Sequence, residues 1–359
     1  MIIMSWKVEQ DEKNMREQFQ YPDMAFPFSV WPDIYSLFLD RAVDAHWHYD
    51  FEYSYVVSGS LDYYINDTYL RLQPGDCVFV NSNMLHTIRQ PDDCDNAIVY
   101  TAAFPTSLVS MDANSTVYAK FLKPIIASQL EGFKIGPDHP LGRQLGALLT
   151  DLLKIYYPGP FLTTKTVSDD YKKYHIDLLN DHLNDLEAGS DVQESRDVIA
   201  RIKKNAKEGP DYGYELECMS RVVRILSLTI CLIEEYKDDL LWRAGSLAQI
   251  ERAREILAYM HEYYRQAITI EDISKHVGIS RKECFRCFKR FTGKKPIEYL
   301  NNYRMLKAAQ MLRENEMSIE VISEGCGFSS ASFFGKMFKE KYDKTPLQFR
   351  RLINDEPER

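Results

Sequence analysis

The chain lacks any apolar run that approaches the ~20 residues a helix needs to cross a bilayer. Its first segment, Met1 to Lys7, lacks the charged start, apolar stretch and cleavage site of a signal peptide. Cysteines are also few: the seven are odd in number and scattered through 359 residues, which suits a reducing compartment. We therefore expect a cytoplasmic protein with no membrane partner and no disulfide framework.

The chain as a whole has fewer basic than acidic residues. Its 44 Lys and Arg stand against 53 Asp and Glu, a net charge of -9, which taken alone argues against nucleic acid binding. Residues 251–351, however, hold 20 basic and 13 acidic residues, a net of +7, so the rest of the chain carries -16. A basic C-terminal module on an acidic body is the pattern expected when one domain contacts phosphate.

The length predicts two or three domains, at roughly 150 residues each. Short segments rich in Tyr, Val, Ile and Phe fill residues 34–104, and turn signals such as Pro74-Gly75-Asp76 separate them, which predicts an all-β barrel or sandwich. Helical periodicity follows from about 115 to 245. It is clearest at 216–236, whose apolar face could pack on the barrel or on a second copy of the chain. The polar stretch 187–213 predicts a surface excursion.

Two short helix-turn-helix units are predicted in the C-terminal module. The first has start signals at Thr269 and at Ser280, where Ser280-Arg-Lys-Glu283 forms a capping box. In the second, Ser318 starts a helix, a glycine-rich turn follows at 325–328, and Ser329 or Ser330 caps the next helix. The repetition of the unit favours a DNA-binding module over an ordinary helical bundle.

The second helix of each unit is amphipathic with a basic outer face. In the first unit the expected buried residues are Cys284, Cys287, Phe288 and Phe291, opposite Lys282, Phe285, Arg286 and Lys289. In the second they are Phe333, Phe334, Met337 and Phe338, opposite Ala331, Ser332, Gly335, Lys336 and Lys339. Helices of this size fit the DNA major groove, although a solvated face on a bundle is the alternative for either one alone.

The segment from Gly278 to Gly293 resembles the first recognition helix of the AraC/XylS family of bacterial transcription regulators. The segment from Gly327 to Pro346, followed by Phe349-Arg350, is similar to that family's signature at nearly every anchoring position and departs from it at Asp343, where glycine is frequent. Residues 296–312 resemble the long helix that joins the two units. The resemblance implies a protein that binds double-stranded DNA and has RNA polymerase as a further partner. The side chains it implies for DNA contact are Lys282, Phe285, Arg286, Lys289, Ser329, Ala331, Ser332 and Lys336.

These side chains differ in what they can recognise. Arg286 can bond guanine in a bidentate fashion and Phe285 can contact a thymine methyl, whereas Ala331 and Gly335 offer no side-chain hydrogen bonds. We therefore predict that the first unit supplies most of the base discrimination and the second mostly phosphate anchoring.

Cys284 and Cys287 form a C-x-x-C pair, a spacing also used in zinc and redox sites. No second Cys or His pair is placed to complete a zinc site. Since both sulfurs fall on the expected buried face, packing is favoured, with redox sensing as the alternative.

His46, His48 and Glu52 share one parity, so on a single strand all three would project from the same face. Together with His86 they resemble the two motifs of a cupin, with departures at Asn81 and Asn83. In metal-dependent cupins the matching positions bind a divalent ion, and three imidazoles with one carboxylate would suit Mn, Fe, Ni or Zn. In the sensor domains of AraC-type regulators the same pattern accompanies a small effector, often a sugar.

We weigh two occupants for this cupin-like domain. The first is an effector, with a sugar favoured because aromatic side chains crowd these strands, held by His46, His48, Glu52, Tyr55 and His86. The second is a divalent metal on His46, His48, Glu52 and His86, which the protein need not require as a cofactor. Catalytic turnover is not expected, so no catalytic residue is assigned.

The sequence thus predicts a multidomain α+β protein that acts as an effector-controlled, sequence-specific transcription regulator and is not an enzyme. The expected parts are an N-terminal arm (1–30), a cupin-like β-barrel (31–110), a helical, dimerising region (111–245), an all-α double helix-turn-helix (246–351) and a tail (352–359). The rivals are a metal-dependent cupin oxygenase or sugar isomerase with a helical appendage, and a scaffold that binds proteins through 216–236.

Overall fold

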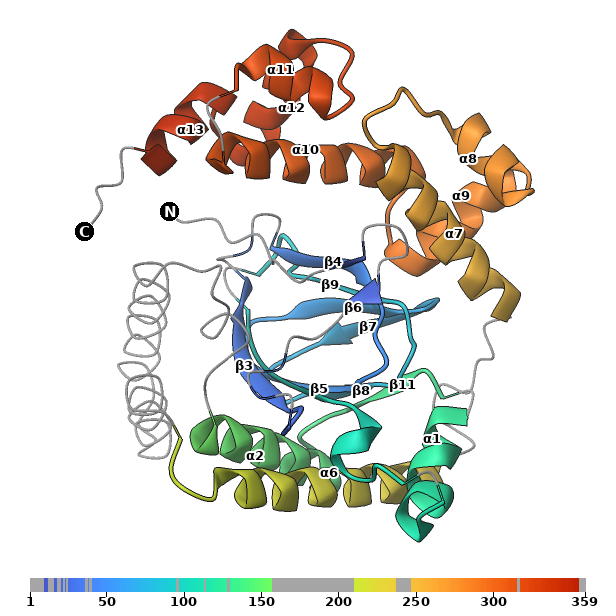
Figure 1. Ribbon diagram of the computed structural model, residues 1–359, viewed down its shortest axis with the longest axis vertical. Coiled ribbons are helices and arrows are strands. Elements are labelled where there is room, and N and C mark those ends of the chain that lie inside the picture. Colours follow the sequence, from blue (N-terminus) through green and yellow to red (C-terminus); the bar gives the residue numbers. More distant parts are fainter. Residues whose placement is uncertain are drawn as a thin grey trace.

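The computed structural model describes residues 10–11, 16–17, 21, 23, 25–35, 38, 41–94, 97–112, 114–127, 130–156, 210–236, 247–314 and 317–354. The described chain forms an antiparallel β domain in the middle of the molecule, with helices on two sides of it (Figure 1). Residues 187–209 of the expected surface excursion lie outside these ranges.

The β domain consists of two stacked sheets and a small hairpin. The hairpin pairs β1 (Gln10–Asp11) with β2 (Arg16–Glu17). The four-stranded sheet has the order β4 (Ala42–His46), β9 (His86–Arg89), β6 (Leu61–Ile65), β7 (Thr68–Leu72). The five-stranded sheet has the order β11 (Gly132–Ile135), β8 (Cys77–Val80), β5 (Phe51–Ser58), β10 (Ile98–Phe104), β3 (Ser29–Ile34). The predicted barrel or sandwich is confirmed.

Turns between these strands lie where the sequence placed its turn signals. Gly59, Asn66 and Gly75 all have positive φ values, of 70°, 47° and 90°. Glycine and asparagine tolerate this left-handed region better than other residues, so each marks a point where the chain can reverse. The β strands therefore begin and end close to the predicted positions.

Successive side chains of β5 point to opposite faces of its sheet and enter two different apolar clusters. Val56 points inward between the sheets, while Phe51 and Tyr53 point outward into a second apolar cluster. That second cluster is covered by α2 (Pro140–Ile155) and α6 (Tyr214–Tyr236), and the Tyr53 hydroxyl lies 2.9 Å from Thr229 Oγ1 of α6. The predicted helix at 216–236 is confirmed, and its apolar face packs on the barrel (Figure 1).

The middle region is not purely helical, contrary to the sequence expectation. A short helix at Thr106–Leu108 precedes this region. The region contains the short helices Tyr118–Leu122 and α1 (Lys123–Ala127), but also the edge strand β11. The four residues of β11 pair with β8 from Gly132↔Val80 to Ile135↔Cys77. A strand this short forms because it pairs with the open edge of a sheet. The helical periodicity of the surrounding sequence does not indicate that pairing.

The C-terminal module is all helical. Its helices are α7 (Leu247–Tyr263), α8 (Ile270–Val277), α9 (Arg281–Thr292), α10 (Pro296–Glu314), α11 (Ile319–Gly325), α12 (Ala331–Tyr342) and α13 (Pro346–Asn354). Thr269, Ser280, Ser318 and Ser330 cap the predicted helices. The full capping box occurs at Thr269, not at Ser280, because the Glu283 carboxylate accepts a hydrogen bond from Arg286 instead. No helix of the described chain is long and apolar enough to span a membrane.

Gly327 is required at the turn before α12. Its φ is +79°, and a Cβ built there would lie 2.4 Å from the carbonyl oxygen of Tyr264. We expect Gly327→Ala to destabilise the module by more than about 2 kcal/mol, measured by urea unfolding. Gly335→Ala is the control: no described atom lies within 4 Å of its added Cβ, so helix propensity alone predicts a gain of up to about 1 kcal/mol. Equal effects of the two substitutions would contradict this account.

Candidate effector site and DNA-binding surface

Four predicted ligands meet inside the β domain, although not on one strand. His46 ends β4, His48 lies in the turn that follows, Glu52 lies in β5, and His86 begins β9 beside His46. The segment from 46 to 52 is therefore not one strand, because the chain turns at 48–50, and shared parity does not explain why these ligands meet. One ligand atom from each residue nevertheless lies within 4.8 Å of the others, and all four residues are buried.

Backbone carbonyls orient the three imidazole rings. The Nδ1 atom of each ring lies 2.8–3.0 Å from a carbonyl oxygen two residues away in the chain. A carbonyl oxygen accepts only, so each Nδ1 carries a proton and each ring directs its Nε2 atom into the cluster. This is the arrangement that orients histidines as metal ligands.

Glu52 is the charged centre of the cluster. Its Oε2 atom lies 3.2 Å from His48 Nε2 and 3.6 Å from His86 Nε2, and His86 Nε2 has no hydrogen-bond partner among the described residues. Burial opposes ionisation of Glu52, but the adjacent His86 and His48 outweigh it and hold the pKa of Glu52 well below its usual range. For His48, burial opposes protonation, but the hydrogen bond and charge of Glu52 raise its pKa to about 9. The cluster therefore favours a positive charge at its centre.

Two residues change the predicted set. Tyr55, expected among the effector ligands, lies on the opposite face of β5 from Glu52, where its ring sits against Gly146 of α2. Glu17, which the sequence analysis missed, comes from β2 and places Oε2 3.1 Å from His46 Nε2. No local pattern marks Glu17, because it reaches the cluster only through tertiary structure.

The predicted DNA-contacting side chains lie on the outer faces of α9 and α12. Lys282, Phe285, Arg286, Lys289, Ser329, Ser332 and Lys336 are exposed, and Ala331 is half-buried. On the inner faces, Cys284, Cys287, Phe288 and Phe291 are buried as predicted, and so are Phe334 and Phe338. Phe333 is the exception: it is 48% exposed and lies on the outer face of α12, so its assignment to the core is wrong.

Arg286 of α9 and Lys336 of α12 each form an ion pair with an acidic residue of the same helix. Arg286 NH2 lies 2.6 Å from Glu283 Oε2, and Lys336 Nζ lies 3.8 Å from Glu340 Oε1. Ion pairs this exposed contribute little to stability, so a phosphate or a base edge can replace the carboxylate at small cost. Both cations remain available to DNA.

Comparison with known proteins identifies two domain families in this chain. Residues 40–101 match the cupin domain family and residues 273–352 match a helix-turn-helix domain family. The chain is 21% identical to the uncharacterized HTH-type transcriptional regulator YdeC of Bacillus subtilis, over 95% of this chain and 97% of YdeC. It is 26% identical to the HTH-type transcriptional activator RhaS of Klebsiella pneumoniae, over 44% of this chain and 54% of RhaS. Residues 273–352 are an AraC-type helix-turn-helix domain, residues 40–101 are a cupin domain, and the chain is similar to transcription regulators.

Solved structures of two regulators also align with this chain. Unsaturated fatty acid bound ToxT from Vibrio cholerae aligns over 92% of this chain and 97% of its own, with 12% identity and a TM-score of 0.34. The DNA-binding domain of AdpA, in complex with a target DNA, aligns over 30% of this chain and 98% of its own, with 23% identity and a TM-score of 0.28.

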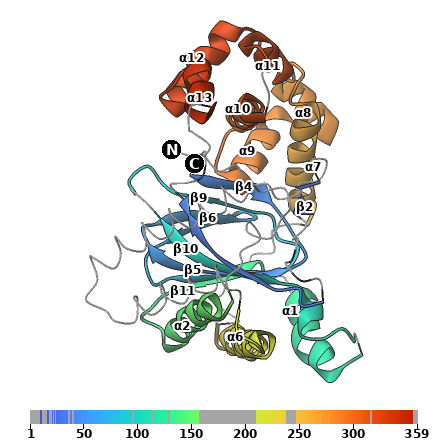
Figure 2. The same ribbon diagram turned by 60° about the vertical axis from the view of Figure 1, so that its left-hand side comes forward.

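The AraC-type domain packs directly on the cupin domain. Trp47 and Leu85 of the cupin domain share one buried cluster with residues of α7 and α9, including Leu257 and Phe288. The Arg254 guanidinium of α7 lies 4.5 Å from the centre of the Trp47 ring and donates to the Asn83 carbonyl oxygen at 2.5 Å. In both ribbon views α7 and α9 lie beside β4 (Figures 1 and 2).

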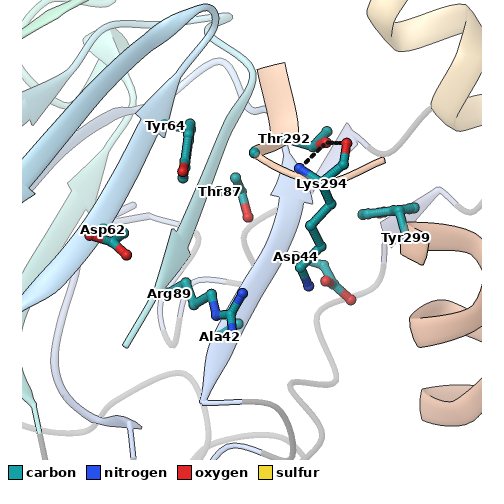
Figure 3. Close-up of a pocket in the computed structure, with 10 residues that line it drawn as sticks. Ala42, Asp44, Asp62, Tyr64, Thr87, Arg89, Thr292, Lys294 and Tyr299 are labelled. Carbon is teal, nitrogen blue, oxygen red and sulfur yellow. Dashed lines mark hydrogen bonds between the residues drawn. The ribbon is translucent and has the colours of Figure 1, made fainter. Parts of the chain in front are cut away.

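A small pocket lies along the same boundary. Side chains of the four-stranded sheet, among them Asp44, Tyr64 and Arg89, face Thr292 and Lys294 across it (Figure 3). Its volume is about 60 Å³, room for a few water molecules but far less than the ~300 Å³ or more of typical ligand pockets. Nearby, Arg290 of α9 forms an ion pair with the buried carboxylate of Asp67. The pocket therefore belongs to the domain boundary and does not offer a sugar-sized site.

The C-x-x-C pair of the AraC-type domain is packed into its core. Burial raises the pKa of both Cys284 and Cys287 to about 11, so thiolate is scarce near neutral pH. We expect a thiol reagent at pH 7.5 to modify the exposed Cys231 at a rate near that of free cysteine. Cys284 and Cys287 should react at least tenfold more slowly, as mass spectrometry of peptides would show. Equal rates for the three would favour redox sensing.

Proposed function

We propose that this AraC-type regulator binds specific double-stranded DNA sites through α9 and α12, and that an ion or effector bound at the histidine cluster controls that binding. The observation that carries the DNA-binding proposal is the pair of amphipathic helices, each with an aromatic inner face and a basic outer face. Each follows a capped turn and is joined to the other by the 19-residue helix α10. A cupin enzyme with a helical appendage explains neither the pairing nor the basic faces.

Base discrimination is assigned to α9 and phosphate contact mainly to α12, as the sequence predicted. Arg286 extends from α9 with its side chain 70% exposed, and Phe285 beside it offers apolar contact to a thymine methyl. Phe333 adds an apolar contact on α12 that the sequence analysis placed in the core. Ser329, Ser332 and Lys336 then supply hydrogen bonds and charge to phosphates.

A divalent metal is the occupant that the cluster's chemistry supports best. Three Nε2 atoms and a buried, ionised carboxylate converge in one cluster, and a cation that displaces the proton from His48 satisfies all four at once. The donor set of three imidazoles and one carboxylate suits Mn, Fe, Ni or Zn. When bound, such an ion would supply a Lewis-acidic anchor for a small oxygen-containing effector. The sugar effector, the homodimer and the contact with RNA polymerase stay predictions from the sequence.

Control of DNA binding is proposed to pass through the contact between the two domains. The ligand residues alternate with boundary residues: Trp47 lies between His46 and His48, and Leu85 precedes His86. A change that moves the histidine side chains therefore moves side chains that pack on α7. An occupant that favours one arrangement of this boundary shifts the population of the DNA-binding form.

The test is selection of genomic fragments by the full-length protein, with and without added Mn²⁺ or Zn²⁺. We expect enrichment of a two-part motif with half-sites about one DNA turn apart, roughly 34 Å. The double variant Arg286→Ala, Lys336→Ala should lose that enrichment. If the wild-type protein enriches no motif under either condition, the DNA-binding proposal is wrong, and metal content and turnover become the measurements that decide between the remaining functions.

Arg254→Ala tests the coupling separately from both sites. The substitution removes the contact with Trp47 and the hydrogen bond to Asn83 and changes neither the ligands nor the recognition helices. Coupling between two sites is typically 5- to 150-fold, and we expect the ratio of DNA affinities with and without metal to approach one in this variant. Arg224→Ala, on the far side of the barrel, is the charge-matched control and should keep the wild-type ratio. The measurement is DNA binding by fluorescence anisotropy.

A further inference from the structure

The N-terminal hairpin brings a second carboxylate to the histidine cluster. Glu17 of β2 is only 3% exposed, and its Oε2 atom lies 3.1 Å from His46 Nε2. Its other oxygen, Oε1, is buried without a hydrogen-bond partner in the described part of the chain. An isolated buried carboxylate is costly, so an orphaned oxygen at this position indicates a missing partner.

Contacts on both sides of Glu17 hold it at this place. Its backbone N–H donates to the Trp47 carbonyl oxygen at 2.9 Å, and Arg16 forms a parallel bridge with Trp47. The Arg16 guanidinium lies 5.7 Å from the centre of the Tyr49 ring. Farther along the arm, the Tyr21 hydroxyl donates to the Asp50 carboxylate. The arm therefore follows the turn at 47–50 that carries His48, and the Glu17 carboxylate is directed rather than free.

His86 provides an independent sign of a missing central group. Its Nε2 atom is buried, directed at Glu52, and also lacks a hydrogen-bond partner among the described residues. Two unsatisfied polar atoms thus border one cluster, a carboxylate oxygen and an imidazole nitrogen. Both are ligand atoms for the same class of divalent ion.

We propose that Glu17 is a fifth, arm-derived ligand of a divalent metal held by His46, His48, Glu52 and His86. This inference rests on the metal occupant proposed above. Two carboxylates and three neutral imidazoles balance the charge of a divalent cation inside a buried site, which four ligands with one carboxylate do not. When bound, the ion would tie Glu17 of the N-terminal arm to the histidine cluster of the barrel, next to Trp47.

The experiment compares full-length wild type with Glu17→Gln, which keeps the size of the side chain and removes its charge. The readouts are the dissociation constant for Mn²⁺ and Zn²⁺, measured by competition with a chelator, and the visible spectrum of the Co²⁺-loaded protein. We expect Glu17→Gln to weaken metal binding more than tenfold and to change the Co²⁺ spectrum. Limited proteolysis should show that metal protects the arm near Glu17 in the wild type but not in the variant.

Glu131→Gln is the matched control, because Glu131 is an equally buried carboxylate that bonds Thr68 and lies outside the cluster. It should keep wild-type affinity and spectrum. A second substitution, Glu17→Ala, tests whether the glutamine amide still binds the ion. If the wild type binds metal and both Glu17 variants match it in affinity and spectrum, the fifth ligand is wrong and the four-ligand site stands. If the wild type binds no metal, both proposals are wrong.

Discussion

Arg286→Ala is expected to weaken binding of the selected DNA site by about 10- to 150-fold and to relax preference at a single base pair. A bidentate arginine–guanine contact contributes ~1–3 kcal/mol of discrimination, and this contribution disappears with the guanidinium. The variant should fold normally, because Arg286 is exposed and its pair with Glu283 lies on the surface of α9. The measurement is binding to a panel of operator variants, each with one base pair changed, at fixed salt.

Lys336→Ala is the comparison within the same domain. A lysine that contacts phosphate carries no sequence information, so its loss should weaken binding to all DNA sequences about equally. It should also reduce the slope of log affinity against log salt concentration by about one. Arg224→Ala on α6 removes the same charge from the opposite side of the molecule and should change neither quantity (Figure 1). If Lys336→Ala relaxed one position while Arg286→Ala weakened every sequence equally, the assignment of the two helices would be reversed.

The recognition helices could be predicted because local rules govern them. Capping serines and a 3.6-residue period determine where α9 begins and which face it buries, and the structure agrees at Cys284 and Phe288. The error at Phe333 has a simple cause. Phe334 and Phe338, four residues apart, take the inner face of α12, and Phe333, about 100° around the helix from Phe334, falls on its exposed side.

The cupin cluster was predicted only in part, because tertiary structure completes it. His46 and Glu52 lie on different strands and meet because the chain turns between them, and the pairing of β4 with β9 adds His86. Parity along β5 alone separates Tyr55 from Glu52, since residues an odd number apart face opposite sides of a strand. Glu17 has no such rule: nothing in the sequence near position 17 indicates which part of the barrel the arm will reach.

Metal loading is expected to stabilise the wild-type protein strongly, and His86→Ala should remove most of that gain. A ligand that binds only the folded state stabilises it by about 4.1 kcal/mol at a thousand times its dissociation constant, and by about 2.7 kcal/mol at a hundred times. The cluster is buried and assembled from two separate stretches of chain, 46–52 and the start of β9 at His86, so the unfolded protein cannot reproduce it. We therefore expect the melting temperature to rise by roughly 10 °C when saturating Mn²⁺ or Zn²⁺ is added to chelator-treated protein.

His86→Ala removes the ligand whose Nε2 lacks a partner among the described residues, and it leaves the orienting carbonyls of the other two rings in place. Loss of one of four ligands should weaken metal binding at least a hundredfold, more than the 10- to 100-fold typical when only a residue supporting a ligand is changed. His276→Ala, an exposed histidine on α8, is the control and should keep the full increase. In the absence of metal, His86→Ala removes a buried nitrogen that lacks a partner among the described residues. We therefore expect it to destabilise the protein by less than the ~2–5 kcal/mol of a typical large-to-small core substitution. If metal raised the melting temperatures of wild type and His86→Ala equally, the ion would be binding elsewhere on the protein.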